Sequence, residues 1–432
     1  MFEPHPEIQY SSPAEIKAFQ EERLREAIAY AAAKSPFYKE MFATTGVAPE
    51  SIRTIEDLRR LPLTTKHDLQ SRNDDFICVG RSEIADYVTT SGTLGDPVSI
   101  ALTASDIERL AYNEELSFGV AGCGSDDVMQ LMVTLDRRFM AGFAYYLGAR
   151  AKGMGVCRVG NGIPQLQWDT IGRIRPTVGM CVPSFLMKLI DHAEQNGIDH
   201  HTSSVKKFIC IGEALRTPDG QYTKLGQQIA ARWPEVSLYT TYASTEMQSS
   251  FTECEHFCGG HSQPELIIAE LLDDDGNPVG EGEVGEVTIT TLGIEGTPLI
   301  RFRTGDMVHH YTGKCKCGRQ TMRLGSVVGR KGQMIKYKGT TLYPPAIFDI
   351  LDGIPGIINY VVEVYTNDLG TDEVKVRVGS RDTSESFAKR IKDIFRAKVR
   401  VAPGVSFDEP DYINKIMFPP TSRKAVKFID LR

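Results

Sequence analysis

The residues best suited to chemistry begin with a loop rich in glycine and hydroxyl side chains, residues 89–97, which reads Thr-Thr-Ser-Gly-Thr-Leu-Gly-Asp-Pro. Glycine lets the backbone N–H groups of such a loop face an anion without obstruction, and the hydroxyls add further donors. Ser91, Gly92 and Thr93 could therefore bind an anion such as a phosphate group. The loop lacks the lysine of a Walker A sequence, and a plain turn is the alternative interpretation.

A second candidate lies in residues 239–246, which read Tyr-Thr-Thr-Tyr-Ala-Ser-Thr-Glu. A strand that runs into a turn here would deliver an aromatic face, hydroxyls and a carboxylate to one place. Mg²⁺ on phosphates takes few protein oxygens, so Thr245 and Glu246 suit it. A helix start capped by Ser244 or Thr245 would explain the same residues.

Three single residues complete the set. Asp306, after a tight turn in residues 301–306, could accept hydrogen bonds from ribose hydroxyls, although an Arg–Asp surface turn is the alternative. Arg330 follows Gly329, where the pattern of the chain changes. Lys424 lies in a C-terminal tail, where a lysine is ordinarily solvated.

Nine cysteines divide into single and grouped ones. Five lie alone in apolar or glycine-rich surroundings and are expected to be small buried core residues: Cys78, Cys123, Cys157, Cys181 and Cys210. Four others are grouped with two histidines, and thiolates with imidazoles favour tetrahedral Zn²⁺. Free thiols and a redox disulfide are the alternatives. The six candidate ligands are Cys254, His256, Cys258, His261, Cys315 and Cys317.

The elements that must position these groups alternate along the chain. Residues 12–45 have a helical pattern that Pro36 interrupts, and residues 61–66 form a loop into a helix capped by threonine. Alternation of β-rich and helical runs from about residue 85 to 330 predicts α/β architecture with substantial parallel sheet. We expect strands at residues 128–133, 207–211 and 238–242, and helices at residues 105–118, capped by Ser105, and 183–196.

A change of pattern divides the chain into two predicted domains. A β-meander is expected over residues 266–290, and a compact α+β unit after residue 330. This unit has strands at 361–365, 373–379 and 405–407 and a helix at 384–398. We therefore expect a domain of residues 1–328 and a smaller one of residues 329–432, with a hinge near Gly329 and Arg330.

Composition narrows the class of protein. A formal net charge of −7 argues against nucleic-acid binding, which needs a concentrated basic face. No apolar run approaches the roughly 18 residues that span a bilayer. Residues 1–5 lack the basic start and apolar stretch of a signal peptide. We expect a cytoplasmic protein with neither a nucleic-acid nor a membrane partner.

Taken in order, these motifs resemble the acyl-adenylate-forming superfamily and, within it, the phenylacetate–CoA ligase family. The resemblance runs end to end and includes residues 35–38 and 61–69. It identifies the loop at Ser91 as phosphate-binding, Asp306 as the ribose-binding aspartate, Arg330 as the hinge arginine and Lys424 as the C-terminal catalytic lysine. The segments that it places around adenine and Mg²⁺ are Gly212, Glu213 and Ala214, then Tyr242, Ala243, Ser244, Thr245 and Glu246.

The resemblance also implies a fold and a reaction. A large N-terminal domain of mixed sheets and helices would bind ATP and acid, and a small C-terminal α+β domain would rotate about the hinge. A carboxylate and ATP would give acyl-AMP and pyrophosphate, and coenzyme A would then take the acyl group. Tyr242 would stack on adenine, Glu246 and Thr245 would hold Mg²⁺, and Lys424 would neutralise charge near the α-phosphate. A homodimer is common in the family.

Zinc-bearing relatives favour one ligand set among the six candidates. These are Cys254, His261, Cys315 and Cys317, with Cys258 and His256 in reserve. The resulting structural Zn²⁺ would clip together the β-rich segment of residues 250–320.

Two alternatives for the function stay open. The acyl group could pass to a carrier protein or an amine, because no motif is specific for CoA. A regulatory protein that binds adenylate without turnover would fit Asp96 in the phosphate loop and Gly332 where the family has a hinge aspartate. The motifs do not identify the carboxylic acid substrate. Residues 135–140 lack the aromatic, glycine-rich pattern expected beside the acyl pocket of an enzyme that binds phenylacetate.

Overall fold

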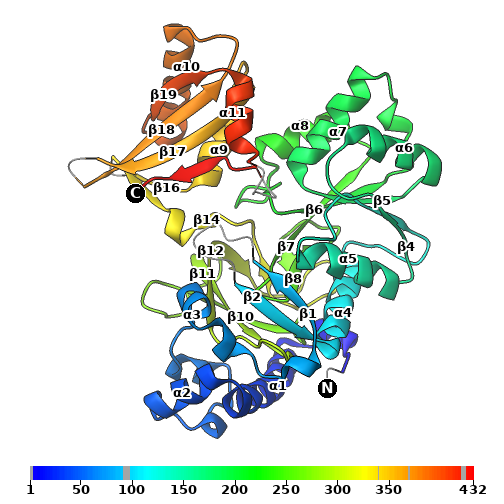
Figure 1. Ribbon diagram of the computed structural model, residues 1–432, viewed down its shortest axis with the longest axis vertical. Helices are drawn as coiled ribbons and strands as arrows, with labels where there is room; N and C mark the ends of the chain where they lie inside the picture. Colours follow the sequence, from blue (N-terminus) through cyan, green and yellow to red (C-terminus); the bar gives the residue numbers. More distant parts are fainter. Residues whose placement is uncertain (1–2, 91–97, 339, 368–369, 420–424) are drawn as a thin grey trace. The chain divides into compact units, whose positions relative to one another are not determined.

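The computed structural model describes residues 3–90, 98–338, 340–367, 370–419 and 425–432 of the 432-residue chain. The chain divides into two compact units (Figure 1). The first comprises Met1–Gln221 and Ile229–Ser326, and the second Tyr222–Gln228 and Val327–Arg432. Within the part of the chain that the structure describes, no helix is both long and apolar enough to cross a bilayer.

The first unit begins with helices whose starts are set by capping side chains. Helix α1 (Pro13–Lys34) begins at Ser12, which forms a capping box with Glu15. The predicted interruption at Pro36 is present, because Ser35 ends α1 and caps α2 (Pro36–Thr45). Helix α3 (Lys66–Ser71) begins at Thr65, as expected, and Asp68 completes its capping box.

The sheet of the first unit is half parallel and half antiparallel. Its hydrogen-bonded order runs β10-β11-β12-β13-β9-β8-β7-β6-β5-β3-β4. Strands β4, β3, β5, β6 and β7 pair in parallel, and the other pairs are antiparallel. The α/β class is therefore confirmed, and β7 is the strand at which the two halves join. The bounds are β3 (Val128–Leu131), β4 (Gly155–Arg158), β5 (Val178–Cys181), β6 (Lys207–Ile211), β7 (Ser237–Ser244), β8 (Ser249–Glu253), β9 (Gly260–His261), β10 (Ile267–Leu272), β11 (Val284–Thr291), β12 (Phe302–Tyr311) and β13 (Arg323–Leu324).

Further helices pack on this sheet. A separate two-stranded hairpin precedes the sheet in the sequence. Helix α5 packs on β3 and β4, α4 packs on β8, and α6 lies against α7 (Figure 1). The two-stranded hairpin pairs β1 with β2. The bounds are β1 (Ile84–Thr89), β2 (Ser99–Thr103), α4 (Ala104–Val120), α5 (Met140–Ala151), α6 (Pro164–Ile174), α7 (Pro183–Gln195) and α8 (Lys224–Arg232).

Helix α4 differs from its prediction in two ways. Its N-cap is Thr103, not Ser105: Thr103 Oγ1 accepts from the N–H of Asp106, whose carboxylate accepts from the N–H of Thr103. Its buried side is also strongly polar, because charged and amide side chains replace the usual apolar stripe. The buried polar residues of α4 are Asp106, Arg109, Asn113, Glu114 and Ser117.

These polar groups bind backbone from distant segments. The fully buried guanidinium of Arg109 donates to three carbonyls, those of Gln248, Leu266 and Leu292, at 2.7, 2.6 and 2.8 Å. Burial lowers the pKa of Arg109 to about 10, so the side chain stays charged at neutral pH. Asn113 accepts from the N–H of Ser250 at 3.1 Å.

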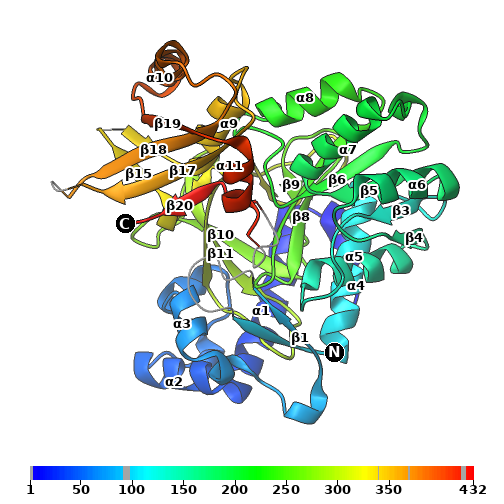
Figure 2. The ribbon, with the colours of Figure 1, turned by 45° about the horizontal axis from the view of Figure 1, so that its top comes forward.

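The second unit is built on a four-stranded sheet in the order β19-β18-β17-β20. The central pair is antiparallel, whereas β19 and β20 each add in parallel. Alternation along the strands sends side chains to two faces: α9 and α10 cover one, and α11 the other (Figure 2). The bounds are β14 (Gly329–Arg330), β15 (Ile335–Tyr337), β16 (Thr340–Leu342), α9 (Pro344–Asp352), β17 (Asn359–Thr366), β18 (Asp372–Gly379), α10 (Glu385–Val399), β19 (Gly404–Asp408), α11 (Pro410–Met417) and β20 (Phe428–Asp430).

Replacement of Arg109 tests how far the first unit depends on this buried cation. Arg109→Met should lower the free energy of unfolding by about 3–5 kcal/mol, because three buried carbonyls lose their donor. Urea unfolding followed by tryptophan fluorescence reports on this unit, which contains both tryptophans, Trp168 and Trp233. Arg25→Met, at an exposed arginine bound to one carbonyl, is the control. Equal stability of the two variants would contradict the prediction.

Candidate nucleotide-binding site and Cys/His cluster

The candidate nucleotide site lies at the carboxyl ends of β6 and β7, next to the junction of the two halves of the sheet. Open α/β sheets bind ligands beyond the carboxyl ends of their strands. Strand β6 leads into Gly212, and β7 leads into a turn over residues 245–248 that returns as β8. The alternative of a capped helix start is wrong: Ser244 Oγ accepts from the N–H of Met247 inside a hairpin turn.

Tyr242 and Asp306 lie together in the structure. The hydroxyl of Tyr242 donates to Asp306 Oδ2 at 2.9 Å, which joins β7 to β12 across the sheet. The ring of Tyr242 lies 6.0 Å from that of Phe251, centroid to centroid. Asp306 is held in turn by its own N–H, which donates to Thr304 Oγ1 at 3.1 Å. An aromatic side chain and a carboxylate suited to a nucleoside are therefore adjacent.

Glu246 lies in the turn after β7 with only 9% of its surface exposed. A cation faces it: Lys66 Nζ is 3.9 Å from Glu246 Oε1. Lys66 is the first residue of α3, and the capping box of Thr65 and Asp68 fixes its position. Lys66 belongs to the motif of residues 61–69, but its residue type and place in the sequence indicate no role for it. A lysine directly after a capping threonine was the available signal, and only the fold brings it to Glu246.

The segment of Gly212, Glu213 and Ala214 follows β6. Gly212 has a φ of 75°, a conformation that glycine adopts without steric cost. The carboxylate of Glu213 accepts from both the N–H and the hydroxyl of Ser184, each at 2.8 Å. Ser184 is in the first turn of α7, so Glu213 binds the start of that helix and anchors the segment.

The remaining residues predicted for the nucleotide site are either outside the described part of the chain or in the second unit. Ser91, Gly92, Thr93 and Lys424 are outside the described residues, as is Asp96. Arg330 belongs to the second unit, after Gly329. A Cβ on Gly329 would come within 2.3 Å of the Tyr343 ring, so only glycine fits there. Lys427, three residues after Lys424 in the sequence, forms an ion pair within the second unit, with Nζ 3.5 Å from Asp352 Oδ1.

The Cys/His cluster brings four of the six candidate ligands together. One ligand atom from each of Cys254, His261, Cys315 and Cys317 lies within 4.8 Å of all the others. Cys254 Sγ is 3.7 Å from Cys315 Sγ, and Cys317 Sγ is 3.5 Å from His261 Nε2. Sulfurs that share a tetrahedral zinc at about 2.3 Å lie about 3.8 Å apart, so these residues fit the ion.

The surroundings of His261 also suit a metal ligand. Thr321 Oγ1 lies 2.9 Å from Nδ1, which leaves Nε2 directed at the thiols. Burial, reinforced by Arg319 and Arg323, lowers the pKa of His261 to about 3, so its imidazole is neutral. A neutral imidazole is the form that binds metal.

The two reserve candidates differ from the four. His256 is partly exposed and lies 3.6 Å from Glu255. Cys258 Sγ approaches Cys315 Sγ to 3.4 Å but also lies 3.0 Å from the Arg323 guanidinium. Hydrogen bonding from Cys254, then contacts with Cys315 and Arg323, lower the pKa of Cys258 to about 5. Arg323 can therefore neutralise a Cys258 thiolate without a metal.

The cysteines outside the cluster follow expectation with one exception. All nine cysteines are in the described part of the chain and are free thiols. Cys78, Cys123, Cys181 and Cys210 are buried, as predicted. Cys157 is only half-buried, because it lies on β4 at the edge of the sheet.

Comparison with known proteins agrees with the fold. The family of AMP-binding enzymes matches residues 16–295, so the chain belongs to that family and, within it, to the phenylacetate–coenzyme A ligase family. The phenylacetate–coenzyme A ligase of Thermus thermophilus is 30% identical over 392 residues, which are 89% of this chain and 85% of the relative. The Escherichia coli enzyme of the same name is 26% identical over 441 residues, 98% of this chain and 97% of the relative.

Solved structures share the fold at lower identity. The 2-hydroxyisobutyryl-CoA ligase in the postadenylation state, in complex with 2-HIB-AMP, superposes with a TM-score of 0.85 at 22% identity. The alignment covers 100% of this chain and 94% of that one.

Proposed function

We propose that this chain joins a small carboxylic acid to coenzyme A in two steps, with an acyl-adenylate between them. The observation that carries the proposal is the convergence of Tyr242, Asp306, Glu246 and Lys66 beside the carboxyl ends of β6 and β7. An aromatic ring, a ribose acceptor, a buried carboxylate and a cation suit the adenine, sugar, metal and phosphates of ATP. Family membership supports the same assignment.

In the first step an oxygen of the substrate carboxylate would attack the α-phosphorus of ATP, and pyrophosphate would leave with the bonding electrons. This chemistry needs positioning and charge neutralisation more than covalent help. Tyr242 would bind adenine and Asp306 the ribose hydroxyls, while Lys66 would face the phosphates. Glu246 and Thr245 would hold Mg²⁺, which neutralises phosphate charge when bound. Ser91, Gly92, Thr93 and Lys424 keep their predicted roles as part of this proposal, as does rotation about Arg330.

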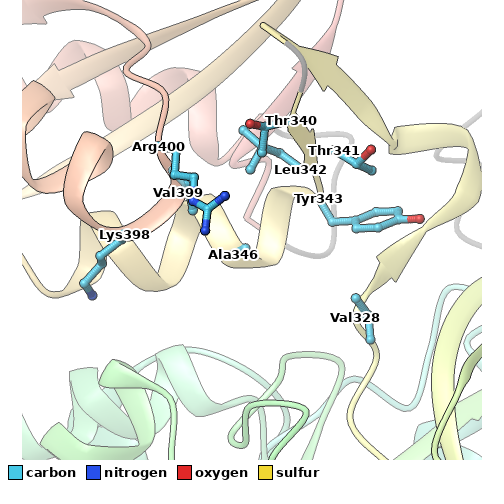
Figure 3. Close-up of a pocket in the computed structure, with 9 residues that line it drawn as sticks. All are labelled: Val328, Thr340, Thr341, Leu342, Tyr343, Ala346, Lys398, Val399 and Arg400. Carbon is cyan, nitrogen blue, oxygen red and sulfur yellow. The ribbon is translucent and has the colours of Figure 1, made fainter.

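In the second step the thiol of CoA would displace AMP from the acyl carbon. The second unit contains a cleft of about 740 Å³ with features suited to the phosphates of CoA (Figure 3). Lys398 and Arg400, at the end of α10, lie on one side, and Thr340 and Thr341 lie on the other (Figure 3). Two cations and two hydroxyls can bind phosphate oxygens.

The Cys/His cluster is best explained as a structural zinc site. Four protein ligands leave no open position for substrate, which distinguishes it from a catalytic zinc. The cluster would clip β9 to the segment after β12, since His261 lies on β9 and the two later cysteines follow β12. Reduced thiols fit the cytoplasm, where we place the protein.

Pyrophosphate release from ATP–Mg²⁺ with a panel of aryl and short-chain acids tests the function. Turnover that requires CoA and yields a thioester is expected. A burst of pyrophosphate that CoA does not relieve would indicate another acceptor, and no release with any acid would contradict the proposal.

Arg400→Glu should raise KM for CoA roughly tenfold but leave the first burst of pyrophosphate unchanged. The control is Arg396→Glu, on α10 but outside the cleft, which should leave KM for CoA unchanged.

Lys66→Ala should raise KM for ATP roughly 10–100-fold in the same assay, because the phosphates would lose a preorganised cation. Lys17→Ala, at an exposed ion pair with Glu56, is the matched control. An unchanged KM for ATP in the Lys66 variant would contradict this role.

Cys315→Ser should abolish stoichiometric zinc, measured by elemental analysis of purified protein. The unfolding temperature should fall by roughly 5 °C or more, because metal binding contributes directly to folding. Cys157→Ser, at the half-buried cysteine of β4, should keep the zinc. A Cys315 variant that retains one zinc per chain would show that this thiol is not a ligand.

A further inference from the structure

The loop from Cys254 to Cys258 contains an aromatic residue that the metal site does not use. Phe257 has a φ of 50°, in the left-handed region that bulky side chains rarely adopt. Its N–H donates to the carbonyl of Cys254 at 3.0 Å and closes a tight turn. A residue keeps such a strained backbone conformation only where its contacts hold it in place, so the contacts of the Phe257 ring are of interest.

The ring of Phe257 lies against the two strands that lead into the candidate nucleotide site. Its centroid is 5.2 Å from that of Tyr239 on β7, with the planes at 52°. It also packs on the hydrophobic cluster that includes Ile209 and Ile211 of β6. Arg216 also lies over the ring, with its guanidinium carbon 4.5 Å from the ring centroid.

Arg216 joins three segments around that site. It is buried, and its Nε is 3.1 Å from Glu253 Oε1, next to the ligand Cys254. It also donates to the carbonyl of Leu238 on β7 at 3.4 Å. Glu253 accepts from the N–H of Thr240 at 3.0 Å. Since Arg216 follows Ala214 by two residues, this pair ties the segment after β6 to β7 and β8.

A buried ion pair needs close geometry to offset the loss of water from both charges. An aromatic face over a guanidinium excludes water and adds a cation–π attraction. Phe257 is thus a second link between the Cys/His cluster and Arg216, beside Glu253. The loop of the cluster therefore contacts Arg216, which binds the segments of the candidate nucleotide site.

We propose that Phe257 is a positioning residue that couples metal binding at the Cys/His cluster to the nucleotide site, through Arg216 and Glu253. This rests on the proposed ATP-dependent function. A metal that holds Cys254 fixes the turn of Phe257, which in turn holds Arg216, the segment of Gly212–Ala214 and the end of β7. Loss of the ring frees these segments without removing any metal ligand.

The test compares Phe257→Ala, Phe257→Tyr and the control Tyr10→Ala in zinc-loaded protein. Tyr10 also lies under an arginine near the cluster, Arg319, at 5.2 Å, but belongs to the N-terminal segment. Zinc content, ATP affinity by calorimetry, KM and kcat, and hydrogen exchange of backbone amides in residues 212–216 and 238–242 are measured for each.

Phe257→Ala should keep its zinc, lose roughly five- to tenfold in ATP affinity, and raise KM for ATP more than it lowers kcat. Its amides at 212–216 and 238–242 should exchange faster, whereas Phe257→Tyr and Tyr10→Ala should match the parent. Unchanged exchange in Phe257→Ala would overturn the inference, as would an effect on KM for the acid alone. If the parent protein bound no ATP, the proposed function would be refuted. Hydrogen exchange of the amides at 212–216 and 238–242 would still test whether Phe257 positions these segments.

Discussion

The buried guanidinium of Arg109 is the interaction on which the rest of the first unit depends. Its hydrogen bonds converge from one helix on the carbonyls of Gln248, Leu266 and Leu292, which belong to three separate connections of the antiparallel half. An arginine without a paired carboxylate is costly to bury, and a hydrogen bond from each of its three nitrogens to a carbonyl offsets part of that cost. Gln248 is the last residue of the turn that contains Glu246. The hydrogen bond from Arg109 to Gln248 therefore helps to position the carboxylate of Glu246, the candidate Mg²⁺ ligand.

Three other arginines with buried or half-buried side chains are instead paired with carboxylates. Arg301 is bidentate to Glu270, with contacts of 3.2 and 3.1 Å, and Arg303 pairs with Glu286 within the β11–β12 region. Arg216 and Glu253 do the same beside β7. Such pairs add little stability compared with apolar packing, but a broken pair is expensive, so each defines one register. They surround the strands that present Tyr242 and Asp306, where a shift of one residue would turn the side chains to the wrong face.

The Cys/His cluster adds a second kind of constraint to the first unit. Its four ligands come from two stretches that are far apart in sequence, and Val120, the last residue of α4, packs against Cys254 and Cys315. The helix that contains Arg109 therefore touches both the turn after Glu246 and the cluster. Val120 is the one other apolar side chain grouped with these thiols in the described part of the chain, so a bound metal would add cohesion that apolar packing does not supply there.

Much of this protein could be determined from its sequence, because local signals act over a few residues. Periodicity and capping residues located α1 to α3, α7, α10 and β6, and the order of motifs identified the family. Residue types pointed to Tyr242, Glu246, Asp306 and six candidate metal ligands, and the resemblance to zinc-bearing relatives selected four of the six. The antiparallel half of the sheet around β7, the parallel addition of β19 and β20, the cap at Thr103 and the polar side of α4 depended on tertiary structure. So did the pairing of Lys66 with Glu246 and the position of Phe257. These features join residues distant in sequence, and their energies come from burial and hydrogen bonds that exist only after the chain has folded.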